Sequence, residues 1–436
     1  MNVILKNATI VTQNQERDVF IGDILIEGNI IRGVAPEISA SNAELVDMSG
    51  LTIIPGLIQT HVHLCQVLFR NMADDLELLD WLTKYIWPME MGHSPESLRI
   101  SAQLGIYEML TSGVTSVLDM GCANHMDVVF EEMERSGIRG FCGKVMMDAG
   151  DQPYRESTRA ALTSTADLIK RWHKTAGDRI RYALAPRFVL TCSDELWAGA
   201  KELSHQHDLL IHTHSSENQT EIKLVQEQTG VRNIEFFVNR KLASSKLCLA
   251  HCIWLSAEEM ASLKKFDINV MHCPAANLKL GSGYARVPEM LEKGINVSLG
   301  SDGAPCNNNL DIFVDMRLAA LIHKPNFGTS AINAQQILDM ATISGAKTLS
   351  LENKVGSIEV GKLADLAILN LNKVHVTPVD NTISQIVYSA QSRDVRHVMV
   401  NGEWVVKDRI PLAYPDEEKI VFTAKKECSK LVKRLN

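Results

Sequence analysis

The middle of this 436-residue chain alternates between short apolar runs rich in β-branched residues and longer stretches of helical periodicity. In the stretch over residues 94–113, for example, Leu98, Ala102 and Ile106 repeat with the spacing of one helix face. The apolar runs number eight and cover residues 51–64, 113–121, 139–148, 179–187, 209–217, 246–252, 268–274 and 295–302. A strand–helix alternation repeated eight times predicts an α/β fold, the (β/α)8 or TIM barrel.

Both ends of the chain differ from this middle, because they contain short alternating strands joined by turns such as Asn401-Gly402. We therefore expect a small β-sandwich domain formed from both termini. Its first part covers residues 1–52 and its second part residues 355–436, with the barrel over residues 53–354 between them.

The last twenty residues predict an amphipathic helix, with Ile420, Ala424 and Leu431 on its apolar side. We expect this helix to pack on its own terminal domain. A contact with a second subunit is the alternative.

Bulk charge and cysteine content exclude several classes of protein. The formal net charge of −8 argues against nucleic acid or an anionic membrane as a partner. Nine cysteines without a C-x-x-C pair indicate neither a disulfide framework nor a thiolate zinc site. The first residues lack the layout of a signal peptide, and no apolar run approaches the roughly 18 residues that span a bilayer. We expect a reduced, cytoplasmic enzyme that acts as a homodimer or a homotetramer.

The first barrel run ends in His61-Val62-His63. Side chains two residues apart in a strand point to the same face, so both imidazoles can face into the barrel and share one ion. An H-x-H pair alone is weak evidence for a metal, because core packing also explains many such pairs.

Further histidines and carboxylates stand where the later runs end, and this set is difficult to explain by packing alone. Active sites of such barrels assemble at the carboxyl ends of the strands. The residues in question are His212, His214 and Glu217 on the fifth run, His251 on the sixth, His272 on the seventh and Asp302 on the eighth. Three imidazoles and one carboxylate leave room for a water, as a catalytic divalent site requires.

These motifs resemble the amidohydrolase superfamily over nearly the whole chain. The matching segments are P-G-L-I-x-x-H-x-H at 55–63, H-x-x-E at 214–217, A-H-C at 250–252, H-C-P-A-A-N-L-K-L-G-S-G at 272–283 and G-S-D-G-A-P at 300–305. More narrowly they resemble the branch that contains methylthioadenosine/S-adenosylhomocysteine and 5′-deoxyadenosine deaminases, guanine deaminases and triazine hydrolases. The resemblance implies a hydrolase that acts on C–N bonds of cyclic amidines.

The resemblance also implies a ligand set and a mechanism. One divalent metal ion per chain, Zn²⁺ or alternatively Fe²⁺, would be held by His61, His63, His214 and Asp302. The fourth run, RIRYALAPR, offers no lysine for the bridging carbamate of binuclear members, so we expect one ion. Asp302 would take the proton of the attacking water, His251 would orient it, and Glu217 would protonate the ring of the heterocycle. His212 is expected to be a core histidine.

The residues expected to bind the substrate do not all point to one compound. Trp81 and Glu90 match positions that pack on the substrate and hold ribose hydroxyls in methylthioadenosine/S-adenosylhomocysteine deaminases. Gln66 and Arg187 instead match positions that hold the base in guanine deaminases. The nucleoside enzymes usually have histidine where Arg187 stands, and an arginine suits a carbonyl such as that of guanine.

Three further positions are candidates for substrate contacts. Lys144 and Arg155 fall near the arginines that bind the homocysteine carboxylate in the nucleoside enzymes, although both can equally be structural charges. His272 is assigned either to the substrate or to support of the ligands.

The substrate that we favour is a 6-aminopurine nucleoside without a 5′-hydroxyl, converted to its inosine analogue and ammonia. Guanine deamination is the first alternative, and a triazine-type amino- or chlorohydrolase is the second. A hydantoin- or amide-cleaving enzyme is a more distant rival that would favour two metal ions, and a non-catalytic scaffold is another.

Overall fold

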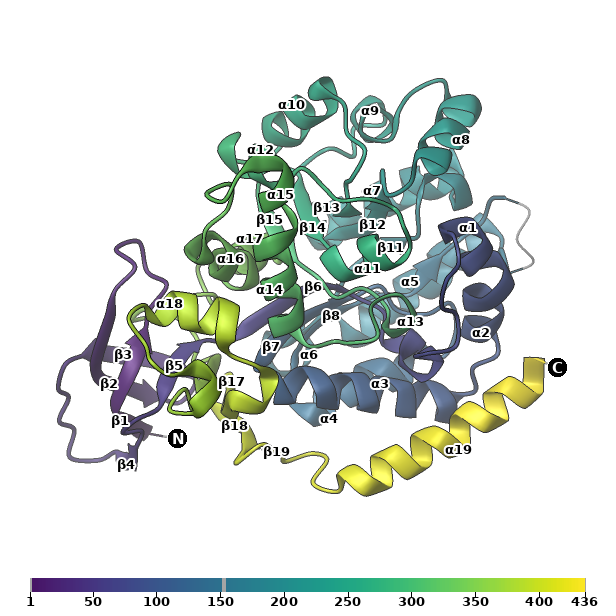
Figure 1. The fold of residues 1–436 in the computed structure, drawn as a ribbon. Helices are drawn as coiled ribbons and strands as arrows, with labels where there is room; N and C mark the ends of the chain where they lie inside the picture. The colour runs from purple at the N-terminus through teal and green to yellow at the C-terminus, as the bar shows by residue number, and fades with distance from the viewer. Residues whose placement is uncertain (1, 151–153, 436) are drawn as a thin grey trace.

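Eight strand positions form a ring of parallel strands around which the helices lie (Figure 1). The structure is a computed structural model that describes residues 2–150 and 154–435. The ring strands are β6 (Leu57–Val62), β7 (Val114–Asp119), β8 (Arg139–Cys142) with β9 (Val145–Met146), β10 (Ile180–Tyr182) with β11 (Ala185–Pro186), β12 (Ile211–Ser215), β13 (Leu247–His251), β14 (Asn269–His272) and β15 (Val297–Leu299).

Two isolated parallel bridges close this ring. One joins Leu184 to Ile211, between the fourth and fifth positions, and the other joins Val62 to Asp302, between the first and eighth. The backbone N–H of Asp302 donates to the carbonyl of His61 at 2.9 Å. The (β/α)8 barrel expected from the sequence is confirmed, and its closure brings two predicted metal ligands side by side.

Helices of very different length surround the ring. The longer ones are α3 (Pro95–Thr111), α4 (Met126–Ser136), α5 (Thr158–Trp172), α7 (Asp194–His207), α8 (Gln219–Thr229), α9 (Asn233–Asn239), α10 (Ala257–Lys265), α14 (Ile312–Ile322) and α16 (Ala334–Ala341). The shorter ones are α1 (Leu78–Trp81), α2 (Trp87–Met91), α6 (Thr175–Asp178), α11 (Pro274–Lys279), α12 (Val287–Glu292), α13 (Ala304–Asn307), α15 (Lys324–Phe327), α17 (Ile343–Thr348) and α18 (Thr382–Ser384). Within the described residues, no helix has the length and apolar character needed to cross a membrane.

Nine strands from both ends of the chain form the second part of the molecule (Figure 1). They are β1 (Asn2–Val11), β2 (Val19–Glu27), β3 (Ile30–Ala35), β4 (Glu44–Asp47), β5 (Thr52–Pro55), β16 (Leu366–Leu369), β17 (Val395–Val400), β18 (Glu403–Lys407) and β19 (Ile410–Pro411). The order is β19-β18-β17-β16-β5-β1-β2-β3, with β4 beside β1. Buried side chains such as Val3, Ile24 and Leu366 build one core for strands of both ends. The expected β domain is present, and its strands join in one continuous sheet rather than two separate ones.

The chain passes from this sheet into the barrel at Gly56. The sequence suggested one strand over residues 51–64, but β5 pairs with β1 and β16 in the terminal sheet, and only β6 enters the barrel. A Cβ at Gly56 would lie 2.1 Å from the Thr115 Oγ1 atom, so only glycine allows this close approach. The division that we expected after residue 52 therefore lies within β5, whereas the chain enters the barrel only after Gly56.

The C-terminal helix α19 (Glu417–Leu435) does not pack on the terminal sheet as expected. It runs along the outside of α3 and reaches α2 (Figure 1). Its buried residues Ile420, Ala424 and Leu431 belong to the same core as the barrel helices. The apolar side predicted from the sequence is present, but it covers the barrel because β19 ends on the α3 side of the sheet.

Candidate metal centre and substrate cavity

The backbone turns sharply at the ends of the fifth, sixth and eighth barrel strands, at or next to predicted site residues. Ser216, His251 and Asp302 all have a positive φ, of 55°, 72° and 63°. Such a backbone is strained for residues other than glycine and is typical of functional sites. At Gly300 a Cβ would lie 2.7 Å from the Cβ of His61, so glycine lets the eighth strand approach the first.

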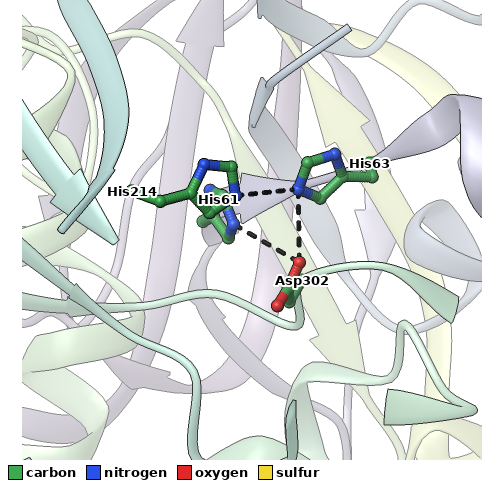
Figure 2. Close-up of side chains that lie close together, drawn as sticks. All are labelled: His61, His63, His214 and Asp302. Atoms are coloured by element: carbon green, nitrogen blue, oxygen red, sulfur yellow. Dashed lines mark hydrogen bonds and ion pairs between the residues drawn. The ribbon is translucent and has the colours of Figure 1, made fainter. Parts of the chain in front are cut away.

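Four predicted ligands meet at one point inside the ring, as Figure 2 shows. The Asp302 Oδ1 atom lies 3.4 Å from the His61 Nε2 atom and 3.3 Å from the His63 Nε2 atom. The His63 and His214 Nε2 atoms are 3.3 Å apart. All four ligand atoms lie within 4.8 Å of one another, which is the spacing of side chains around one small cation.

Hydrogen bonds and burial prepare these imidazoles to bind a metal. The His214 Nδ1 atom lies 2.7 Å from the Arg187 carbonyl oxygen, which can only accept, so the Nε2 atom keeps its lone pair. Among the described residues the buried His61 Nε2 atom has no hydrogen-bond partner. Burial lowers the pKa of His61, His63 and His214, which favours the neutral form that coordinates metals. The four residues fit one divalent ion.

His212 supports this cluster from a deeper layer of the barrel. Its Nε2 atom lies 2.6 Å from the Nδ1 atom of His61, and the two rings meet edge to face. With His61 as the donor in this bond, the His61 Nε2 atom is left free for a metal. The sequence predicted a core histidine here, and the structure adds a contact that orients a ligand.

Two carboxyl groups of the site have opposite protonation tendencies. Burial acts to raise the pKa of Asp302, but the contacts with His61 and His63 hold it well below its usual range. Burial raises the pKa of Glu217 well above its usual range, and the carboxylates of Asp302 and Glu221 raise it further. These surroundings favour the ionised form of Asp302 and the protonated form of Glu217, as a base and an acid require.

His251 lies between these two carboxyl groups. Its Nε2 atom is 3.5 Å from the Glu217 Oε2 atom and 3.9 Å from the Asp302 Oδ2 atom. Its Nδ1 atom bonds the Asn277 Oδ1 atom at 2.8 Å, which orients the ring. The Ser282 Oγ atom donates to Glu217 at 3.3 Å. Asn277 and Ser282 lie in the matched 272–283 segment, but the sequence alone assigned them no role.

Glu221 holds the turn that carries Glu217, and it was also missed. Its carboxylate accepts from the backbone N–H groups of Ser216 at 3.3 Å and Glu217 at 2.8 Å. It forms a capping box with Asn218 at the start of α8. The pattern N-x-x-E directly after Glu217 was the signal for this role.

Asp315 holds the turn that carries Asp302 in a similar way. The Ser301 Oγ atom donates to Asp315 at 2.7 Å, and the Asn307 Nδ2 atom donates to the Ser301 carbonyl at 2.8 Å. Gln59 on β6 also bonds Ser301. Burial raises the pKa of Asp315 to about 7. No local pattern marks the whole network, because Gln59 lies 242 residues before Ser301.

A cavity opens on three of the four predicted ligands, His63, His214 and Asp302. Its wall is partly apolar and partly polar, and segment 78–82, which includes α1, covers one side. The lining residues are His63, Gln66, Leu78, Leu79, Trp81, Leu82, Arg187, Phe188, His214, Glu217, Glu221, His251, Leu280 and Asp302. Three predicted substrate residues, Gln66, Trp81 and Arg187, are among them.

The other predicted substrate residues lie outside this lining. Glu90 is buried behind Gln66 and Arg187, and both of these side chains bond its carboxylate. His272 is buried next to His323, with ring centroids 5.5 Å apart. Their contacts with a substrate stay predictions.

Lys144 and Arg155, the two cationic residues predicted to contact the substrate, both bond residues that are near them in the sequence. Lys144 forms an ion pair with Glu156, and Arg155 donates to the Gly150 carbonyl at 3.2 Å. Neither side chain lines the cavity described above, so their contacts with a substrate also stay predictions.

Comparison with known proteins supports the resemblance seen in the sequence. The model of the amidohydrolase family matches residues 52–405. The chain is 40% identical over 389 residues to a 5′-deoxyadenosine deaminase of Methanothermobacter thermautotrophicus, covering 89% of this chain and 90% of the relative. It is 37% identical over 410 residues to a 5-methylthioadenosine/S-adenosylhomocysteine deaminase of Thermococcus onnurineus, covering 94% and 95%.

Solved structures agree with this grouping. An adenosine deaminase from Xanthomonas campestris with bound zinc superposes with a TM-score of 0.93 at 27% identity, covering 99% of both chains. A guanine deaminase from C. acetobutylicum with guanine in its active site superposes with a TM-score of 0.85 at 26% identity, covering 93% of this chain and 100% of the other.

The bond between His212 and His61 predicts a role in metal affinity. His212→Gln should weaken zinc binding by about 10- to 100-fold, as is usual when a partner that orients a ligand is lost. Zinc affinity measured by competition with a chelator tests this, with the exposed His205→Gln as the matched control. Unchanged affinity in His212→Gln would show that the contact does not orient His61.

The raised pKa of Asp315 predicts a pH-dependent stability. Unfolded, this carboxyl ionises near 3.8, whereas in the fold it keeps its proton to about pH 7. Unfolding therefore releases a proton between these values, and this contribution to stability is lost as the pH rises towards 7. Melting temperatures measured from about pH 5 to about pH 7 should fall less in Asp315→Asn than in the wild type. The exposed Asp380→Asn is the control, and equal slopes in all three proteins would contradict the assignment.

Proposed function

The chain belongs to the amidohydrolase family, and we propose that it hydrolyses the amino group from an adenine nucleoside that lacks a 5′-hydroxyl. The products are the corresponding inosine analogue and ammonia. The observation that carries this proposal is the acid and base pair, Glu217 and Asp302, placed at one cavity with three imidazoles. The relatives at 37–40% identity named above supply the substrate class.

A metal ion belongs to this proposal. His61, His63, His214 and Asp302 would hold one Zn²⁺ per chain, with Fe²⁺ as the alternative. When bound, such an ion supplies a Lewis acid that makes water nucleophilic at neutral pH. Zinc in the adenosine deaminase from Xanthomonas campestris supports this choice.

The chain's own residues move the protons. The ionised Asp302 accepts a proton from the water that attacks the amino-bearing carbon. The protonated Glu217 donates its proton to a ring nitrogen, which makes that carbon electrophilic. The His251 Nε2 atom, which lies between Glu217 and Asp302, accepts a hydrogen bond from this water and orients it. The proton held by Asp302 then passes to the amino group, the C–N bond breaks and ammonia leaves. The hydroxyl proton of the adduct returns to Glu217 as the carbonyl of the inosine analogue forms, so both carboxyl groups regain their starting states.

Guanine is the second candidate, and one observation favours it. Arg187 and Gln66 both line the cavity, and a guanidinium donates to a carbonyl that guanine has and adenine lacks. A triazine or another substituted azine remains a third alternative. The homodimer or homotetramer expected from the sequence stays a prediction.

Ammonia release from a panel of compounds tests the substrate. We expect the highest kcat/KM with 5′-deoxyadenosine, methylthioadenosine or S-adenosylhomocysteine, lower values with adenosine, and the lowest with guanine and a triazine. Metal-loaded Asp302→Asn serves as the inactive control. A preference for guanine would select the second candidate, and the absence of ammonia with every compound would refute the proposal.

Glu217→Gln tests the proposed acid. The variant keeps the side-chain shape but cannot donate a carboxylic proton, so kcat should fall by about 10²- to 10⁴-fold with zinc content unchanged. The matched control is Glu227→Gln, the same change at an exposed position on α8. Full activity in metal-loaded Glu217→Gln would overturn the mechanism.

A further inference from the structure

A buried ion pair joins Arg187, in the wall of the substrate cavity, to Glu90 behind that wall. The Arg187 Nη1 atom donates to the Glu90 Oε2 atom at 2.6 Å, and its Nη2 atom donates to Oε1 at 3.2 Å. The Gln66 Nε2 atom donates to the same Oε1 atom at 2.8 Å. Glu90 is 4% exposed and Arg187 is 2% exposed, so both carboxylate oxygens are already engaged in a dry environment.

Glu90 lies one layer behind the two residues that it contacts. Gln66 and Arg187 line the cavity, whereas Glu90 does not. On its other side the Cys65 Sγ atom lies 3.8 Å from the Glu90 Oε1 atom, and the thiol of Cys122 points to the Glu90 carbonyl at 3.7 Å. A substrate in the cavity therefore meets Gln66 and Arg187 first.

The bond to Glu90 also fixes which end of the Gln66 amide faces the ligand. Because the Nε2 atom donates to the carboxylate, the Oε1 atom is turned away from it. That oxygen is buried and has no hydrogen-bond partner among the described residues. A Cβ at Gly303 would lie 1.9 Å from it, so it sits against the backbone beside Asp302.

We infer that Glu90 is a positioning residue that acts through Arg187 and Gln66 and not by holding the sugar itself. On the proposed function, on which this inference rests, the cavity wall then presents the ligand with the side chains of Gln66 and Arg187, both held in place by Glu90. The remaining N–H groups of the Arg187 guanidinium favour a ligand edge that carries a hydrogen-bond acceptor.

The donors of Arg187 restrict how a purine can bind. Adenine offers ring nitrogens as acceptors for Arg187, whereas guanine offers a carbonyl as well as ring nitrogens. In either case the contact with Arg187 is made by the base and not by the sugar.

A double-mutant cycle with Glu90→Gln and Arg187→Met tests the inference, with 5′-deoxyadenosine as the substrate. Each single variant should raise KM by a factor of about 10 to 100, the worth of one or two charge-assisted hydrogen bonds, and change kcat much less. The KM of the double variant should be no higher than that of the more strongly affected single variant, because both substitutions break the same contact. The double variant also removes both buried charges, so its melting temperature should be no lower than that of Arg187→Met, which leaves Glu90 buried without a counter-charge.

Adenine separates positioning from direct contact with the sugar. The inhibition constant of free adenine should rise in Glu90→Gln by about the same factor as the KM of the nucleoside, because the base meets Arg187 in both. An unchanged constant for adenine with a raised KM for the nucleoside would place Glu90 on the sugar and overturn the inference. An increase of KM in the double variant that equals the product of the two single increases would also overturn the inference.

Asp365→Asn is the matched control. Asp365 forms a similarly buried pair with Arg139, with two bonds of 2.8 Å, but neither residue lines the cavity. This variant should lower the melting temperature and leave KM unchanged. If the wild type releases no ammonia, the proposed function fails. In that case the rise in melting temperature that adenine and 5′-deoxyadenosine cause in each variant measures the affinities instead, and comparing the two ligands still tests the role of Glu90.

Discussion

The proposed chemistry depends on the convergence of three imidazoles and one carboxylate from separate parts of the chain. Parallel strands bring their carboxyl ends to one rim, so β6, β12 and the end of β15 can each contribute a ligand. Closure between Val62 and Asp302 completes the ring where two ligand-bearing strands meet. Because a metal site tolerates little displacement, the bonds behind the ligands matter as much as the ligands themselves.

Arg187 joins the metal cluster to the wall of the substrate cavity. Its carbonyl oxygen accepts from the His214 Nδ1 atom, and its guanidinium pairs with Glu90. A shift of this residue would therefore change the orientation of a ligand and of the cavity wall together. The deep burial of both Arg187 and Glu90 suits this double use.

The sequence predicted the barrel well, because the period of the apolar runs located the strands. Histidines and carboxylates stood at the ends of these runs, and the family resemblance selected His61, His63, His214 and Asp302, which the structure brings together. The division of the first run at Gly56 could not be predicted, since both halves have the same apolar character. The placement of α19 on the barrel depends on where the preceding strand ends in space, which periodicity does not encode.

Contacts between distant segments escaped the sequence for a related reason. Glu90 and Arg187 are 97 residues apart, and each alone was consistent with direct contact to a substrate. The structure shows that these two residues form an ion pair with each other. A buried arginine needs a counter-charge, since a dry, unpaired guanidinium is strongly destabilising. Arg187, at the end of the fourth strand, has this counter-charge in the carboxylate of Glu90. With Glu90 engaged in this pair, the side chains of Gln66 and Arg187 are the ones that line the cavity.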